Sequence, residues 1–455
     1  MVKFSGYRSE VIQQHTAERV VIQAEDYHAK HPEFESLLSN EDSFFHVLFP
    51  EYLYSDSSQP EGTPSGLMAK TLLKRLQVGQ MYRPNNRKSI YFYRTVYRGT
   101  SGVALIGGLS REDYRNRKII PHEGYIPEKK SAIKKKAKEL GYFTSLPMVC
   151  NDLPEPLNKF IAEFVFDSPL FSVKKNGVLH QLFELSPEET KFVSAQFNQV
   201  EKLFITDGHH RFEGYSEVID ELESAPDLIE DSDLIPVAVY NVGQISVLRF
   251  YRLLQNVGGL EPTELNHFLK LSSEIFEISE LTSDQEDAFL NCLIHKESTD
   301  PIFSPVSSIQ DEKISSLHPS LNEFSTRLEP NDQTEFSVFV SGLKKWFKFK
   351  SRKAIEGLHL NFLHNTYLSK FLGSGLPGKI SYLSETQGNF LFQMKLADEG
   401  RHNNLVVLYY KMKADEVLEA TEKKIKFPPK SSLFYPKPLV GMLLRPLFAP
   451  CQQTN

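Results

Sequence analysis

The sequence predicts an α+β protein with two domains, residues 1–240 and residues 241–455. Its length of 455 residues is typical of two or three domains. Apolar runs of strand length and segments with helical spacing occur in both halves of the chain. No repeat of 20–50 residues is present, so nothing indicates a repeat architecture. The boundary is placed near Asn241, directly after a strand predicted at Ile235–Tyr240.

The first domain is predicted to contain helices and strands in mixed order. Helical spacing around Phe34, a buried strand at 44–49 that ends at a proline, and a polar loop at 52–65 come first. Further predicted segments are a helix at 66–77, a hairpin of 90–97 with 103–109, an extended piece at 119–123, a lysine-rich helix at 127–140 ended by a glycine, and a strand at 200–205 followed by a helix to about 223.

In the second domain, residues 336–340 and 346–349 alternate like paired strands. Residues 405–410 are predicted to form a strand and residues 414–421 a helix. These segments again mix both element types, in keeping with a second α+β domain.

Composition excludes several classes of protein. With 52 Lys+Arg against 58 Asp+Glu, the net charge of −6 disfavours a protein that binds nucleic acid by charge alone. Cys150, Cys292 and Cys451 lie far apart, which argues against a disulfide framework or a cysteine zinc site. The N-terminus lacks the apolar core of a signal peptide, and no segment approaches the ~20 apolar residues of a membrane helix. We therefore expect a cytoplasmic protein that does not enter a membrane.

The strongest functional signal is Asp207–Arg211 (DGHHR), between the strand at 200–205 and a helix. We call this segment the anion cradle. Gly208 permits a tight turn, and the helix presents free N–H groups and its positive end to a phosphate. Arg211 can donate two parallel hydrogen bonds, and His209 and His210 can donate as well. Asp207 can hold a magnesium ion or a substrate hydroxyl. In the alternative, structural interpretation, the histidines cap the helix and Arg211 pairs with Glu213 or another nearby acid.

Weaker signals lie elsewhere. Glu123 beside His122 can act as a general base, although such pairs are more often found on the surface. The lysine run at 129–138 is typical of a charged helix face. Residues 373–378 fit GxGxxG by letter but lack its strand-to-helix context, so a loop is expected there. The segment 430–438 either grips a phosphate or carboxylate or is an ordered strand; its candidate binding residues are Lys430, Ser431, Tyr435 and Lys437.

Taken in order, His122–Glu123, the lysine-rich helix and the anion cradle resemble the catalytic block of the ParB/sulfiredoxin-like superfamily, including its free serine kinases. The resemblance implies a ParB/sulfiredoxin-like first domain with a mixed sheet. It also implies Glu123 as the base and His209, His210 and Arg211 as phosphate contacts.

Over nearly its whole length the chain is also similar to the family called domain of unknown function 1015. The segments that carry this similarity occur in the order of that family: residues 40–51, 119–123, 206–211, 358–373 and 429–437.

These signals favour a nucleotide-dependent phosphotransferase that acts on a small hydroxylated metabolite such as serine. ATP or ADP with magnesium is the expected cofactor, and Lys430, Tyr435 and Lys437 are expected to close the site. The alternatives are a non-catalytic, ParB-type nucleotide-binding regulatory protein and a structural interaction protein. The sequence contains no helix-turn-helix pattern that would indicate a nucleic acid partner. The sequence indicates no oligomeric state.

Overall fold

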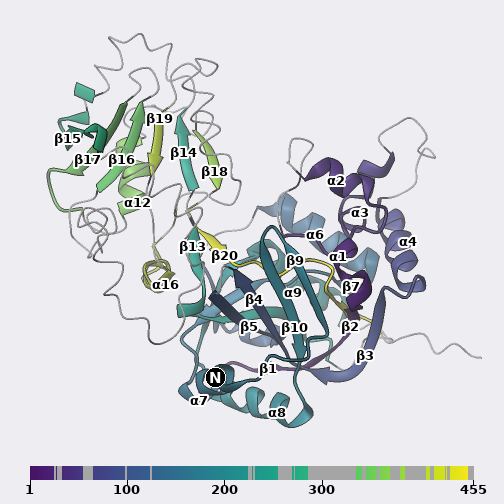
Figure 1. Ribbon diagram of the computed structural model, residues 1–455. Helices are drawn as coiled ribbons and strands as arrows, with labels where there is room; N and C mark the ends of the chain where they lie inside the picture. The colour runs from purple at the N-terminus through teal and green to yellow at the C-terminus, as the bar shows by residue number, and fades with distance from the viewer. Residues whose placement is uncertain are drawn as a thin grey trace, which may run out of the picture. The chain divides into compact units, whose positions relative to one another are not determined.

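The structure is a computed structural model, drawn in Figure 1. It describes residues 1–24, 27, 33–54, 65–97, 100–122, 126–223, 228, 231–248, 250–254, 269–270, 272–284, 335–340, 345–355, 359–368, 380–384, 406–409, 414–425, 427 and 431–448. The chain forms two compact units. The first contains Met1–Ile245 and the C-terminal segment from Pro436, and the second contains most of the chain between them. The expected domains differ from this division in one respect, because the sequence places the C-terminal segment with the second domain.

A mixed nine-stranded sheet forms the centre of the first unit. Its strands follow the order β6-β11-β8-β12-β5-β4-β10-β9, with β1 paired to β5. The pairs β11–β6 and β12–β8 are parallel and the other pairs are antiparallel. This confirms the α+β class with a mixed sheet. The strands are β1 (Phe4–Ser5), β4 (Tyr91–Tyr97), β5 (Thr100–Ser110), β6 (Ile119–Pro121), β8 (Met148–Asn151), β9 (Phe171–Lys175), β10 (Val178–Glu184), β11 (Leu203–Asp207) and β12 (Leu234–Asn241).

A four-stranded sheet, β3-β2-β21-β7, shows why the C-terminal segment belongs to the first unit. In it, β21 (Leu443–Pro446) pairs with β2 (Tyr7–Ile12) and with β7 (Tyr142–Phe143), while β3 (Tyr82–Ser89) pairs with β2. A strand buried between two partners stabilises the unit through backbone hydrogen bonds that no local sequence pattern reveals. The C-terminal segment is therefore part of the first unit, where it pairs with a strand near the N-terminus.

Helices of the first unit include α6 (Pro127–Leu140) and α9 (His209–Leu222), which lie side by side. Lys134 bonds to Glu221 at 2.8 Å near the middle of α6, and Lys138 bonds to the same carboxylate at 2.7 Å. At the other end, the N–H of Ile126, directly before α6, bonds to His210 in the first turn of α9. The two helices therefore run in the same direction, with their N-termini together. The lysine run is a charged helix face that pairs with α9.

The helix α6 has the bounds that the sequence predicts. Pro127 occupies its first turn, where a missing N–H costs no hydrogen bond, and Gly141 ends it at φ +74°. The other helices of the unit are α1 (Gln14–Val20), α2 (Phe34–Ser39), α3 (Phe45–Leu48), α4 (Ser65–Val78), α5 (Arg111–Arg115), α7 (Glu155–Glu163) and α8 (Pro187–Gln196), with 3-10 turns η1 (Pro50–Tyr54), η2 (Phe197–Gln199) and η3 (Val242–Gln244).

The predicted strand at 44–49 is wrong, because Phe45–Leu48 forms the short helix α3. The Oγ of Ser43 accepts a hydrogen bond from the N–H of Phe45 at 3.2 Å and stabilises this turn. Burial of Phe44 and Phe45 agrees with the apolar run. A short apolar run has no periodicity that separates a strand from a buried helical turn, so only packing decides.

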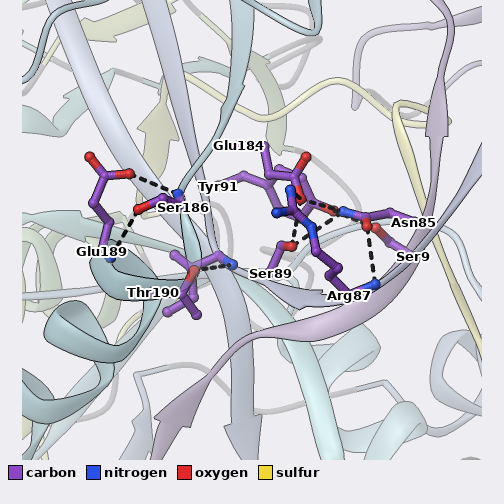
Figure 2. Close-up of polar contacts among 10 residues, drawn as sticks. Ser9, Asn85, Arg87, Ser89, Tyr91, Glu184, Ser186, Glu189 and Thr190 are labelled. Carbon is purple, nitrogen blue, oxygen red and sulfur yellow. Dashed lines mark hydrogen bonds and ion pairs between the residues drawn. The ribbon is translucent and has the colours of Figure 1, made fainter.

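Strand β3 is polar, and side-chain hydrogen bonds hold it in place (Figure 2). The Oε1 of Glu184 in β10 accepts bonds of 2.7 Å from Asn85, Arg87 and Ser89. Tyr91 Oη accepts a further bond from Asn85 at 2.8 Å. One partly buried carboxylate thus joins the end of β10 to a strand whose sequence has no alternating apolar pattern.

The second unit is also α+β. Its six-stranded sheet has the order β15-β17-β16-β19-β14-β18, and β13 pairs with β20 separately. The predicted pairing of 336–340 with 346–349 is confirmed, as β16 and β17 are antiparallel. Its elements are β13 (Ser246–Leu248), β14 (Phe250–Leu254), β15 (Phe276–Glu280), β16 (Glu335–Val340), β17 (Lys345–Ser351), α12 (His359–Asn361), the π-helix η7 (Phe362–Leu368), β18 (Ile380–Ser384), β19 (Val406–Tyr409), α16 (Ala414–Glu422) and β20 (Leu433–Tyr435). Within the described ranges of both units, no helix has the length and apolar character needed to cross a membrane.

Candidate functional site

Two parallel strands bring the predicted motifs together. In the pairing of β6 with β11, Pro121 lies opposite Ile205, so the carboxyl ends of both strands meet at one edge of the sheet. His122 directly follows β6, and its Nδ1 donates a hydrogen bond to the carbonyl oxygen of Ile205 at 2.7 Å. His122 is therefore buried and oriented beside the anion cradle. Most His-Glu pairs lie on the surface, but this histidine does not.

The turn between β11 and α9 depends on an irregular strand end and on a glycine. The register between β11 and β8 shifts between Ile205 and Asp207, which makes Thr206 an extra residue at the strand end. Gly208 adopts φ +84°, a conformation that side chains with a Cβ rarely adopt. A Cβ at this position would lie 2.8 Å from Arg211 Nε. Glycine thus serves both the turn and the close approach of the guanidinium.

Asp207 lies between two cations. Its Oδ1 accepts a hydrogen bond from Lys437 Nζ at 2.7 Å, and its Oδ2 accepts one from Arg211 Nη2. Burial raises the pKa of Asp207, but the charges of Lys437 and Arg211 outweigh burial and hold that pKa well below its usual value. Arg211 also donates from Nη1 to the carbonyl oxygen of Leu146 at 3.1 Å. The carboxylate is ionised at neutral pH and holds both cations at the start of α9.

The three histidines of the site have different surroundings. The rings of His122 and His209 meet edge to face, with centroids 4.6 Å apart. Burial lowers the pKa of His122 to about 4, and burial together with the neighbouring His122 lowers the pKa of His209 well below its usual value. Both rings are therefore neutral at pH 7. His210 Nε2 accepts a bond from the N–H of Ile126 at 2.8 Å, so its proton lies on Nδ1 when the ring is neutral.

Two buried polar atoms of the site have no hydrogen-bond partner within the described part of the chain, namely His209 Nε2 and Thr206 Oγ1. His209 is only 8% exposed and Thr206 4%. Leaving a buried donor or acceptor without a partner costs roughly 1–3 kcal/mol, so such atoms often indicate a ligand or an ordered water. Here they lie next to Arg211 at the N-terminus of α9, where an anion is favoured.

The structure brings together most of the residues that the sequence indicates. Five lie around one turn: His122, Asp207, Gly208, His209 and Arg211. His210 adjoins them, and Lys437 joins from the C-terminal segment.

The alternative, structural interpretation of the anion cradle is confirmed in part. Arg211 does pair with a nearby acid, and that acid is Asp207. Glu213 instead accepts a hydrogen bond from Tyr114.

The other predicted residues lie outside the described residues or in the second unit. Glu123, Lys430 and the 373–378 segment lie outside the described residues. Ser431 and Tyr435 belong to the second unit, where Tyr435 pairs with Ser246 of β13. Sequence reasoning missed Thr206, the carbonyl of Leu146 and the second helix N-terminus at α6. The position of α6 directly after His122–Glu123 was the signal for that N-terminus.

The residues do not form a ready metal site. In the described ranges, no three His, Cys, Asp or Glu side chains gather to hold a metal ion. Both oxygens of Asp207 already accept bonds from cations, which a magnesium ion would have to displace. Magnesium binding by Asp207 therefore stays a prediction.

Comparisons with known proteins give a family and several similar structures. The family model described as "Protein of unknown function (DUF1015)" matches residues 4–368. No curated protein matches the chain. A conserved hypothetical protein from Pyrococcus furiosus is 12% identical with a TM-score of 0.31, over 75% of this chain and 93% of that one. A free serine kinase in complex with AMP is 13% identical with a TM-score of 0.32, over 76% and 93%. A variant of a free serine kinase in complex with ADP is 14% identical with a TM-score of 0.33, over 76% and 94%.

Proposed function

The chain belongs to the DUF1015 family, and from the geometry of the anion cradle we propose that it binds the phosphates of ATP or ADP and transfers a phosphoryl group to a small hydroxylated metabolite such as serine. The observation that carries this proposal is the pairing of Arg211 and Lys437 around a single carboxylate, beside the buried and unpartnered His209 Nε2 of the described structure. Asp207, His209 and Arg211 lie at the start of α9, and His210 joins this helix to the N-terminus of the parallel helix α6.

Charge supports an anionic ligand. At pH 7 Arg211 and Lys437 contribute two positive charges, Asp207 contributes one negative charge, and His122 and His209 are neutral. The described groups of the site therefore carry a net positive charge in a partly buried place. A phosphate would balance that charge and would accept hydrogen bonds from His209, Arg211 and Lys437. A guanidinium has five N–H donors and an ammonium three, so both can hold Asp207 and a phosphate together.

The chemistry follows from this cradle. Phosphoryl transfer depends mainly on positioning and on stabilising the charge of the transferred group. In the proposed reaction the hydroxyl oxygen of the acceptor attacks the terminal phosphorus, the bond from that phosphorus to the bridging oxygen breaks, and the acceptor proton passes to Glu123. Arg211 and Lys437 neutralise the phosphate charge, and Asp207 orients both cations. Ionised Asp207 is too weak a base to take the proton itself.

A second candidate function is nucleotide binding without turnover, as in a ParB-type regulatory protein. One observation favours it. The carboxylate of Asp207, which lies within the cradle, is neutralised by two cations and is a poor base. A cradle of this kind holds phosphates but does not by itself activate a hydroxyl. The two candidates therefore differ in whether Glu123 reaches the acceptor.

Phosphate transfer from ATP and from ADP to serine and to a panel of hydroxy acids tests the proposal, with 31P NMR to detect the phosphorylated product. Glu123→Gln should abolish transfer and leave nucleotide binding intact, whereas Arg211→Ala should weaken binding itself. Arg19→Ala is the matched control, because Arg19 pairs with Asp42 on the surface. Binding with no transfer to any acceptor would favour the regulatory function. Absence of nucleotide binding by the wild-type protein would refute both.

A further inference from the structure

Lys437 reaches the anion cradle from a short segment that is anchored on both sides. We call Pro436–Leu439 the C-terminal strap. Before the lysine, Tyr240 Oη donates a hydrogen bond to the carbonyl oxygen of Pro436 at 3.2 Å. After it, the N–H of Leu439 donates to Tyr93 Oη at 3.2 Å. Between these two anchors, Lys437 Nζ bonds to Asp207 at 2.7 Å.

The two anchors are rigid parts of the central sheet. Tyr93 comes from β4 and Tyr240 from β12, and their side chains are 0% and 1% exposed. Tyr93 Oη also lies 2.6 Å from Nδ1 of the fully buried His180 in β10. A hydroxyl fixed in a closely packed core defines the position of the backbone that it contacts. The strap is thus held at two points by strands that do not belong to the cradle.

We propose that Tyr240 and Tyr93 are positioning residues that fix Lys437 against the phosphate of the bound nucleotide. This inference rests on the proposed function, because it concerns the same anion. A lysine side chain has many rotamers, and its ammonium contributes to binding only when the backbone places it within hydrogen-bond distance. A misplacement of about 1 Å at such a site has large effects on binding and catalysis.

The strap brings Lys437 to the cradle from a distant part of the sequence. Lys437 lies beyond residues 4–368, which the family model matches. It directly follows β20 (Leu433–Tyr435) of the second unit and yet belongs to the first. Its contribution to the cradle therefore depends on the anchors in β4 and β12 and not on its neighbours in sequence.

Titration calorimetry with inorganic phosphate and with ADP tests this assignment. Tyr240→Phe and Tyr93→Phe each keep the ring and remove one hydroxyl. Each should weaken binding about tenfold, equivalent to about 1.4 kcal/mol. Tyr82→Phe is the matched control, because Tyr82 is buried and its Oη donates to the carbonyl oxygen of Gly441 at 2.6 Å, further along the same C-terminal segment. It should reduce thermal stability to a similar extent and leave binding unchanged.

A double-mutant cycle separates positioning from general stability. Lys437→Met should weaken binding, and addition of Tyr240→Phe to it should cause no further loss. Independent, additive losses would overturn the inference, as would an equal loss of affinity in Tyr82→Phe. If the wild-type protein binds and neither tyrosine variant changes the affinity, this inference is overturned and the proposed function still stands. Failure of the wild-type protein to bind phosphate or ADP would instead refute the proposed function.

Discussion

Replacement of Asp207 by asparagine should destabilise the protein and yet strengthen its binding of phosphate. In the structure this carboxylate is the internal counter-ion of Lys437 and Arg211. Asparagine keeps the size of the side chain but removes the negative charge. The two cations then lack a counter-ion in the ligand-free protein and attract an external anion more strongly.

The exposure of Asp207 and general magnitudes together set the size that we expect for both effects. Exposed ion pairs contribute about 0–1 kcal/mol, and loss of one partner of a buried pair costs about 3–5 kcal/mol. The Asp207 side chain is 20% exposed, so we expect a loss of roughly 2 kcal/mol in the free energy of unfolding. A carboxylate about 6 Å from a phosphate repels it by roughly 3 kcal/mol at an effective dielectric constant of about 20. Partial exposure reduces that by about half, which corresponds to binding about tenfold tighter.

Thermal unfolding with increasing phosphate, together with calorimetry, measures both effects. Asp220→Asn is the matched control, because Asp220 also bridges two cations, Arg111 and Arg115, but lies away from the cradle. It should destabilise without changing phosphate affinity. Because the folded pKa of Asp207 is depressed, its stabilisation is present above its unfolded pKa of about 3.9 and is lost as pH falls below it. Weaker phosphate binding by Asp207→Asn would refute the counter-ion role.

Three further predictions concern single residues. Gly208→Ala should lower the free energy of unfolding by about 1–2 kcal/mol because of its positive φ, and should weaken phosphate binding by displacing Arg211; denaturant unfolding and calorimetry measure these losses. Glu184→Gln should lower stability by about 1–3 kcal/mol. Burial raises the pKa of Glu184, but hydrogen bonds outweigh it and lower that pKa, so the difference between wild type and variant should shrink below about pH 4.3 in a pH series of unfolding curves. Burial raises the pKa of the Cys150 thiol, so peptide mapping should find it alkylated only after unfolding; rapid labelling of the folded protein would contradict its burial.

Local sequence signals predicted much of the first unit. Helix α6 was predicted with its bounds because a proline at its start and Gly141 at its end are local determinants. The turn at Gly208 was predicted for the same reason, since the glycine, the histidines and Arg211 are consecutive in sequence. These two features depend on residues that are neighbours in sequence, so the sequence alone predicts them.

Features that depend on distant partners could not be read in this way. Strand β3 is polar and is held by Glu184, about a hundred residues further along the chain. The apolar run at 44–49 is compatible with a buried strand and with a buried helical turn, and packing selects the helical turn. Lys437 was noted as a candidate, but its pairing with Asp207 spans 230 residues and depends on the strap. Long-range pairing of this kind leaves no periodic pattern in a single sequence.

The most direct test of the central claim is calorimetry of ADP binding to the wild-type protein and to Arg211→Ala, over a series of salt concentrations. The account predicts binding by the wild-type protein that weakens with salt, and a loss of at least tenfold in the variant, because the guanidinium holds the phosphate. Equal affinity of the two proteins for ADP would show that the cradle at the start of α9 is not the phosphate site.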